Sequence, residues 1–102
     1  MAVLNITKDQ FEQEVIHSEL PVCIDFYATW CGPCKMMAPV IDKLSEEVEG
    51  VKFISIDVDN AEDIALQYNV SSVPCLIYLI DGEEKIRHTG PAPKSKILEM
   101  LS

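Results

Sequence analysis

Basic residues are scarce in this chain of 102 residues. Lysine and arginine together number 8, against 17 aspartates and glutamates, which gives a formal net charge of −9 at pH 7. A surface of this sign repels phosphate backbones, so the sequence argues against nucleic acid as a ligand. The acidic residues are scattered over expected helix faces, where such charges are typically an ordinary solvated surface.

Long apolar runs and secretory features are lacking as well. Although 48% of the residues are hydrophobic, no stretch is long enough to span a bilayer, so we expect no membrane segment. No basic region followed by an apolar one precedes the first expected strand, and we therefore expect a cytoplasmic protein. The sequence also has no linker, repeat or low-complexity segment. We expect residues 1–102 to form a single domain with its own core.

Cysteine is present, and its four copies need an explanation. They are Cys23, Cys31, Cys34 and Cys75. Thiols in the cytoplasm are normally kept reduced, which favours catalytic, metal-binding or buried cysteines over a structural disulfide framework. A zinc site needs four ligands, and the remaining cysteines and histidines offer no second pair at the usual spacing. We therefore expect a redox pair, with no metal and no cofactor.

The sequence Cys31-Gly32-Pro33-Cys34 stands where an apolar strand gives way to a helix. A helix N-terminus has unpaired backbone N–H groups and partial positive charge, so a thiol placed there is stabilised as a thiolate. We expect Cys31 to be that thiol. Cys34 follows one helical turn later, with Cβ atoms on the order of 5 to 6 Å apart, so a small adjustment closes a disulfide. Gly32 permits close approach of another backbone, and Pro33 suits a first helical turn.

The apolar pattern predicts strands and helices in the order β-α-β-α-β-α-β-β-α, typical of one α/β layered domain. The expected strands are residues 3–6, 22–28, 52–57, 76–80 and 84–89. The first helix is expected over 8–17, with a capping box of Thr7 and Gln10. A long helix begins at the cysteine pair, passes through Pro39 and ends at Gly50.

Shorter signals predict the remaining elements. Asn60 is the expected N-cap of a short helix that ends near Asn69. Asp81-Gly82 predicts a hairpin turn. In the last helix we expect the aliphatic residues at 97, 98 and 101 to face the core, namely Ile97, Leu98 and Leu101.

Asp25 is the one acidic residue in a strand that is otherwise apolar on both faces, a pattern typical of a strand in the middle of a sheet. Burial raises the pKa of a carboxyl group towards the working range, which would suit Asp25 as the proton acceptor for Cys34. Without the neighbouring cysteines, a structural acid held by a hydrogen bond would be the preferred interpretation.

The sequence from Asp25 to Met36 (DFYATWCGPCKM), together with Ala38-Pro39, Val73-Pro74 and Gly90, resembles the thioredoxin family over essentially the whole chain. The match is specific, because the cysteine pair has a tryptophan before it, Gly-Pro inside it and a distant proline. The resemblance implies an α/β fold with a central five-stranded mixed β-sheet flanked by four α-helices. It also implies that Pro74 follows a cis peptide bond and packs against the cysteine pair.

The resemblance further implies a general dithiol-disulfide oxidoreductase that reduces disulfides in partner proteins and is recharged by a thioredoxin reductase. Cys31 is the expected nucleophile, Cys34 the resolving thiol and Asp25 the proton acceptor. We expect a monomer. The apolar surface that partners touch is expected to comprise Trp30, Gly32, Pro33, Val73, Pro74, Gly90 and Pro91.

Several positions depart from the pattern of the family. Tyr27 replaces a common tryptophan and should keep the packing, while Pro91 and Pro93 stiffen the loop after Gly90. Ser55 stands where many bacterial thioredoxins carry a lysine close to the buried acid, which leaves the electrostatic tuning of that acid open. Cys75 replaces the familiar threonine after the proline.

If residues 76–80 pair antiparallel with residues 22–28, Cys75 lies opposite the end of that strand, well away from Cys23. We therefore expect no bridge between the two, because disulfides need Cα atoms within about 7 Å. Cys23 in mid-strand is expected to behave as a small buried hydrophobe. For Cys75 two interpretations stay open, a buried stand-in for threonine with little reactivity or an auxiliary thiol that tunes the main pair. We favour the first.

Two other functions remain open from the sequence. One is a non-catalytic binding module of the same fold, against which the presence of both thiols counts. The other is an oxidase or isomerase, although Gly32-Pro33 resembles the reducing members and oxidases usually carry histidine in that dipeptide.

His17 and His88 are expected to be solvated surface groups.

Overall fold

The computed structural model describes residues 2–102, and a five-stranded mixed sheet forms its centre. The strands are β1 (Leu4–Asn5), β2 (Val22–Tyr27), β3 (Lys52–Asp57), β4 (Cys75–Ile80) and β5 (Glu83–Thr89). In the sheet they follow the order β1-β3-β2-β4-β5. The first three are parallel, whereas β4 runs antiparallel to β2 and β5 antiparallel to β4. The predicted sheet is confirmed, with each strand end within one residue of its expected place.

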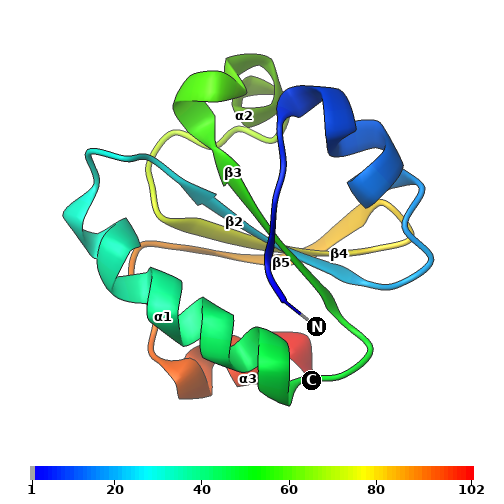
Figure 1. Ribbon diagram of the computed structural model, residues 1–102, viewed down its shortest axis with the longest axis vertical. Coiled ribbons are helices and arrows are strands. Elements are labelled where there is room, and N and C mark those ends of the chain that lie inside the picture. The colour runs from blue at the N-terminus through cyan, green and yellow to red at the C-terminus, as the bar shows by residue number, and fades with distance from the viewer. Residues whose placement is uncertain (1) are drawn as a thin grey trace.

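Helices cover both faces of the sheet (Figure 1). On one face lie α1 (Gly32–Glu47) and α3 (Lys94–Leu101), and on the other lie α2 (Glu62–Gln67) and the first helical segment. The central strand β2 is buried on both sides because its residues alternate between two cores. Ile24 and Phe26 pack towards α2, whereas Cys23 packs towards α1 and α3. Among residues 2–102 no helix has the length and apolar character to cross a membrane.

The first helical segment is less regular than expected. Instead of one α-helix it contains a 3-10 turn (Lys8–Gln10) followed by a π-helical turn (Glu12–Ile16). Gln10 Oε1 accepts the Thr7 N–H at 2.9 Å, as the predicted capping box requires. The His17 N–H donates to the Glu12 carbonyl oxygen at 2.9 Å, which is the wider bond of a π-helical turn. The Lys52 ammonium donates to the Glu14 carbonyl oxygen at 3.0 Å, one of the carbonyl groups that a helix end leaves without an intrahelical partner.

The long helix α1 ends earlier than predicted. Cys31 is its N-cap, and the helix continues through Pro39 but stops at Glu47 rather than at Gly50. Val48 has an extended backbone (φ −96°, ψ 115°) and packs, partly buried, against the core under α1. Gly50 instead supplies a positive φ of 80° in the turn that leads into β3.

The helix α2 also begins differently from the prediction. Asn60 is not its N-cap, because it belongs to a 3-10 turn (Val58–Asn60) that follows β3 directly. Asp57 caps this turn by accepting the Asp59 N–H at 3.0 Å, so the N-cap position of α2 falls to Ala61. At the other end Asn69 has a φ of 55°, as expected of a residue that ends a helix.

The C-terminal part of the chain matches the predicted hairpin but not every core position. Asp81 and Gly82 both have positive φ values, 53° and 79°, which is the conformation that joins two antiparallel strands by a two-residue turn. In α3, Ile97 and Met100 are buried, whereas Leu98 is 40% exposed. Residues three apart share a helix face, so Met100 takes the place in the core that was expected for Leu98.

Candidate active site

The cysteine pair lies at the N-terminus of α1, directly after the turn that leaves β2. Cys31 and Cys34 form a disulfide, with their Cα atoms 5.3 Å apart. As the N-cap, Cys31 has an extended backbone, and its Sγ accepts the Cys34 N–H at 3.1 Å. Pro33 occupies the first turn, where an N–H would have no helical partner. The N–H groups and partial positive charge of the helix end therefore stabilise a thiolate at Cys31.

A loop from the other half of the chain reaches this sulfur. The Val73–Pro74 peptide bond is cis, and the Val73 carbonyl oxygen lies 3.8 Å from Cys31 Sγ. Gly90 follows β5 and donates its N–H to the Pro74 carbonyl oxygen at 2.8 Å. The fold thus brings together three segments that are far apart in the sequence, in the geometry that the resemblance to thioredoxins implies.

The predicted partner surface is mostly open. Gly32, Pro33 and Pro91 are exposed and Trp30 is 71% exposed, whereas Val73 and Gly90 are partly buried. Pro74 differs from the prediction, because it is buried beneath this surface rather than part of it. Its place in the core follows from its position directly before β4, which is buried along almost its whole length.

Asp59 is a residue of the site that the sequence analysis missed. Its Oδ2 accepts the indole N–H of Trp30 at 2.9 Å and so holds an exposed aromatic side chain beside the cysteine pair. The sequence signal that could have identified Asp59 was its position directly after a strand. Because β2 and β3 are parallel, the residues that follow both strands emerge at the same edge of the sheet, which places Asp59 near Trp30.

Asp25 is buried as predicted, on the side of β2 that faces α1. Its side chain is 5% exposed, and burial raises the pKa of the carboxyl group to about 7. Within residues 2–102, Asp25 Oδ1 has no hydrogen-bond partner. The alternative of a structural acid held by a hydrogen bond therefore finds no support at this oxygen. A carboxyl group in this state can accept a proton near neutral pH.

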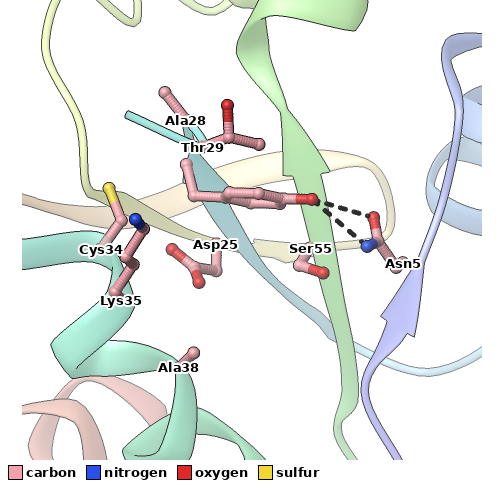
Figure 2. A pocket seen from close by; sticks show the side chains of 9 residues that line it. Asn5, Asp25, Ala28, Thr29, Cys34, Lys35, Ala38 and Ser55 are labelled. Carbon is pink, nitrogen blue, oxygen red and sulfur yellow. Dashed lines mark hydrogen bonds between the residues drawn. The ribbon is translucent and has the colours of Figure 1, made fainter. Parts of the chain in front are cut away.

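A cavity of about 330 Å³ joins this carboxyl group to the resolving cysteine. Figure 2 shows Asp25, Cys34 and Lys35 on one side of the cavity and Ser55 and Asn5 on the other. The Asp25 carboxyl group points towards the side formed by Cys34 and Lys35. The carboxyl group and Cys34 therefore border the same cavity.

The other two cysteines are free thiols on opposite faces of the sheet. Cys23 pairs in register with Tyr78, and Cys75 pairs with Phe26, so the expectation that they form no bridge is confirmed. Burial, and then the nearby Asp25 carboxylate, raise the pKa of Cys23 to about 12. Burial also raises the pKa of Cys75.

The two histidines lie outside the cysteine site. His17 is exposed and lies 3.7 Å from a Glu12 carboxylate oxygen. His88 is partly buried, and its Nε2 lies 3.2 Å from the Pro91 carbonyl oxygen, which ties down the loop after Gly90. In the part of the chain that the structure describes, no three His, Cys, Asp or Glu side chains are grouped so that they could hold a metal ion.

Comparison with known families agrees with this geometry. The family model described as Thioredoxin matches residues 2–102. The chain belongs to the thioredoxin family. Together with the Cys31–Cys34 disulfide, family membership makes it a protein dithiol-disulfide oxidoreductase.

Individual relatives resemble the chain over nearly its full length. Thioredoxin C-2 of Corynebacterium nephridii is 43% identical over 100 residues, which cover 97% of this chain and 93% of that protein. The thioredoxin of Pyropia yezoensis is 41% identical over 103 residues, covering 100% and 96%. The thioredoxin of Rickettsia felis (strain ATCC VR-1525 / URRWXCal2) is 38% identical over 99 residues, covering 96% and 94%.

Among the departures from the thioredoxin pattern, Tyr27 gains a contact that a tryptophan would not make in the same way. Its hydroxyl group lies 3.2 Å from Asn5 Nδ2 and 3.4 Å from Asn5 Oδ1, so the phenol reaches across β3 to the edge strand β1. Ser55 is in register with both Asn5 and Asp25. The departures at 27 and 55 therefore meet at the same cavity.

Proposed function

We propose that this protein reduces disulfide bonds in partner proteins and is returned to its dithiol form by a thioredoxin reductase. The observation that carries the proposal is the hydrogen bond from the Cys34 N–H to Cys31 Sγ at the N-terminus of α1. It supports Cys31 as the nucleophile, because a sulfur that accepts a backbone N–H at a helix end is stabilised as a thiolate.

The reaction begins with the Cys31 thiolate. It attacks one sulfur of the partner's disulfide, forms a mixed disulfide and expels the other sulfur as a thiolate, which takes a proton from solvent. Cys34 then loses its proton and attacks Cys31 Sγ. The Cys31–Cys34 disulfide forms, the mixed disulfide breaks and the second partner thiol leaves. Two electrons pass from the dithiol to the partner, and the reductase later supplies two electrons and two protons.

Asp25 is the proposed proton acceptor for Cys34. The role is supported by its position in the same cavity as Cys34 and by a pKa near 7, which is matched to proton transfer at neutral pH. As a carboxylate, Asp25 takes the thiol proton while Cys34 attacks. It must release that proton before the next cycle.

Partner proteins are proposed to dock on the exposed residues around the cysteine pair, with Trp30, Pro33 and Pro91 as apolar contacts. Val73 and the neighbouring backbone can pair with an extended segment of the partner, as a strand does at a sheet edge. Such a face must be free for transient docking, which favours a monomer. We also propose a cytoplasmic location, where thiols are kept reduced and the reducing direction is sustained.

The test is reduction of insulin, coupled to NADPH through a thioredoxin reductase. We expect turnover with the wild-type protein and none with Cys31→Ser. Absence of turnover with every thioredoxin reductase tried would favour a binding module of the same fold. Net formation of disulfides in a reduced, unfolded substrate, without reductase-coupled turnover, would favour an oxidase.

A further inference from the structure

A row of polar residues crosses the sheet from the buried carboxyl group to the sheet edge. In the parallel pairings, Asp25 on β2 is in register with Ser55 on β3, and Ser55 is in register with Asn5 on β1. Neighbouring strands are about 4.8 Å apart, so each member of the row is one short step from the next. Exposure rises along the row, from buried Asp25 through partly buried Ser55 to exposed Asn5. Figure 2 shows Ser55 between the other two.

All three residues line the cavity of about 330 Å³ that also reaches Cys34. One water needs about 30 Å³, so the cavity has room for several, and a carboxyl, a hydroxyl and an amide group provide the polar partners that ordered waters require. The Asp25 oxygen without a partner is one such group. The Asn5 side chain is held at the outer end by its hydrogen bonds to the Tyr27 hydroxyl group.

Towards β4, Asp25 has no polar neighbour. Its partner on β4 is Leu76, which is fully buried. The titratable groups on its side of the sheet include Cys34 and Lys35 from α1, Cys23 and Tyr27 from its own strand, Tyr78 from β4 and His88 from β5. Cys34 is the proton donor in the proposed reaction, and Cys23 is a buried thiol, so neither passes a proton to solvent.

We propose that Ser55 and Asn5 position a chain of waters in this cavity that carries the proton from Asp25 to solvent at the β1 edge. The inference rests on the proposed function, since it supplies the exit for the proton that Cys34 gives up. The proton moves from the Cys34 thiol to the Asp25 carboxylate, along the waters and into bulk solvent, while the electrons stay in the disulfide exchange. Ser55 is thus a positioning residue, and Asp25 remains the group that takes the proton.

The test follows the reduced protein as it reacts with 5,5′-dithiobis(2-nitrobenzoate), supplied at less than one equivalent. Attack by Cys31 releases one coloured thiolate, and resolution by Cys34 releases the second, so the two steps appear as separate phases. For Ser55→Ala we expect an unchanged first phase and a second phase slowed about tenfold, because a proton that stays on Asp25 returns to Cys34 before attack is complete. Ser55→Thr keeps the hydroxyl group and should restore the rate, whereas Ser95→Ala, an exposed serine of α3, serves as the matched control.

Two further measurements separate a proton path from a purely structural role. With fewer groups to solvate the carboxylate, Ser55→Ala should raise the pKa of Asp25, measured by NMR of its carboxyl carbon, and shift the pH profile of the second phase the same way. Asn5→Leu places an apolar side chain at the outer end of the cavity and should also slow the second phase, with thermal unfolding showing that the variant is folded.

Wild-type rates in the second phase for both Ser55→Ala and Asn5→Leu would overturn the proposal. So would a slower second phase with an unchanged Asp25 pKa and pH profile, because a distorted fold would then explain the rate. A wild-type protein that shows neither phase would overturn the proposed function, and the water path with it.

Discussion

The four cysteines form two pairs that are equally buried and chemically opposite. Cys31 and Cys34 are 5% and 4% exposed, and Cys23 and Cys75 are 2% and 1% exposed, so exposure does not distinguish the pairs. Backbone donors do. The first pair lies at a helix N-terminus, where the Cys34 N–H has no backbone partner within the helix and donates to Cys31 Sγ. The backbone around Cys23 and Cys75 instead forms the hydrogen bonds of the sheet.

Charge strengthens the contrast. Asp25 lies two residues from Cys23 on the same face of β2, and its carboxylate adds to burial in raising the pKa of that thiol. The same carboxyl group lines a cavity with Cys34, and we propose that it takes the proton of that thiol. One acidic side chain thus raises the pKa of one cysteine and, in the proposed mechanism, assists the ionisation of another.

The largest expected effect is the loss of one member of the reactive pair. Cys31→Ser removes the attacking thiolate and should abolish disulfide reduction, whereas Cys34→Ser should leave attack intact and accumulate a mixed disulfide through Cys31. Mass spectrometry of the adducts checks this, with Cys23→Ser as the matched control that keeps its activity. Adducts through Cys34 in Cys31→Ser, with none through Cys31 in Cys34→Ser, would reverse the two roles.

The second effect concerns alkylation of the buried pair. In the oxidised protein Cys31 and Cys34 are protected, so iodoacetamide can label only Cys23 and Cys75. A pKa of about 12 at Cys23 lies about three units above that of an ordinary thiol, which lowers the thiolate fraction about a thousandfold. We expect no labelling of either cysteine before unfolding, measured by mass spectrometry against time. Rapid native labelling of Cys75 would instead make it an auxiliary thiol.

The third effect is the pH dependence of stability that Asp25 causes. Its pKa is 3.8 in the absence of structure and about 7 in the fold. Between these values the unfolded chain ionises first, so stability is fully present below about pH 4 and falls as pH rises to about 7, by up to about 4 kcal/mol. Asp25→Asn should remove that fall and add about 2 kcal/mol at neutral pH, after allowance for a buried amide.

Denaturant unfolding of the oxidised protein at pH values on both sides of this range measures the difference. The variant should also lower the pKa of Cys23, since one of the two causes that raise it is gone. Equal or lower stability of Asp25→Asn at neutral pH would mean that the carboxylate is paired in solution.

The smallest expected effect comes from Ser55→Lys, which places a cation one strand away from Asp25 and uses the space of the cavity. The cation favours the carboxylate, so the pKa of Asp25 should fall by about one unit. Carboxyl NMR checks this, and Ser55→Met, of similar length without charge, is the control. An equal fall in both variants would show that filling the cavity, rather than charge, sets the pKa.

Most of the fold could be predicted because its signals are local. Alternating apolar residues indicated the strands, and glycine and asparagine at positions of positive φ indicated turns. The errors occurred where a distant group intervened. Lys52 of β3 donates to a carbonyl oxygen at the end of the first helical segment. Asp57 caps a 3-10 turn that contains Asn60, the residue expected to cap α2, and Val48 leaves α1 to pack against the core.

By itself the sequence determined which residues carry the chemistry. The helix start places Cys31 and Cys34 one turn apart, and the apolar strand around Asp25 requires that its carboxyl group be buried. Only the tertiary structure decided what surrounds them. The contact of Val73 with Cys31, the bond between Asp59 and Trp30, and the row from Asp25 to Asn5 all join segments separated by many residues. These contacts depend on strand order and register. Order and register are set by the packing of the two cores against the sheet, and the spacing of residues along the chain does not reveal them.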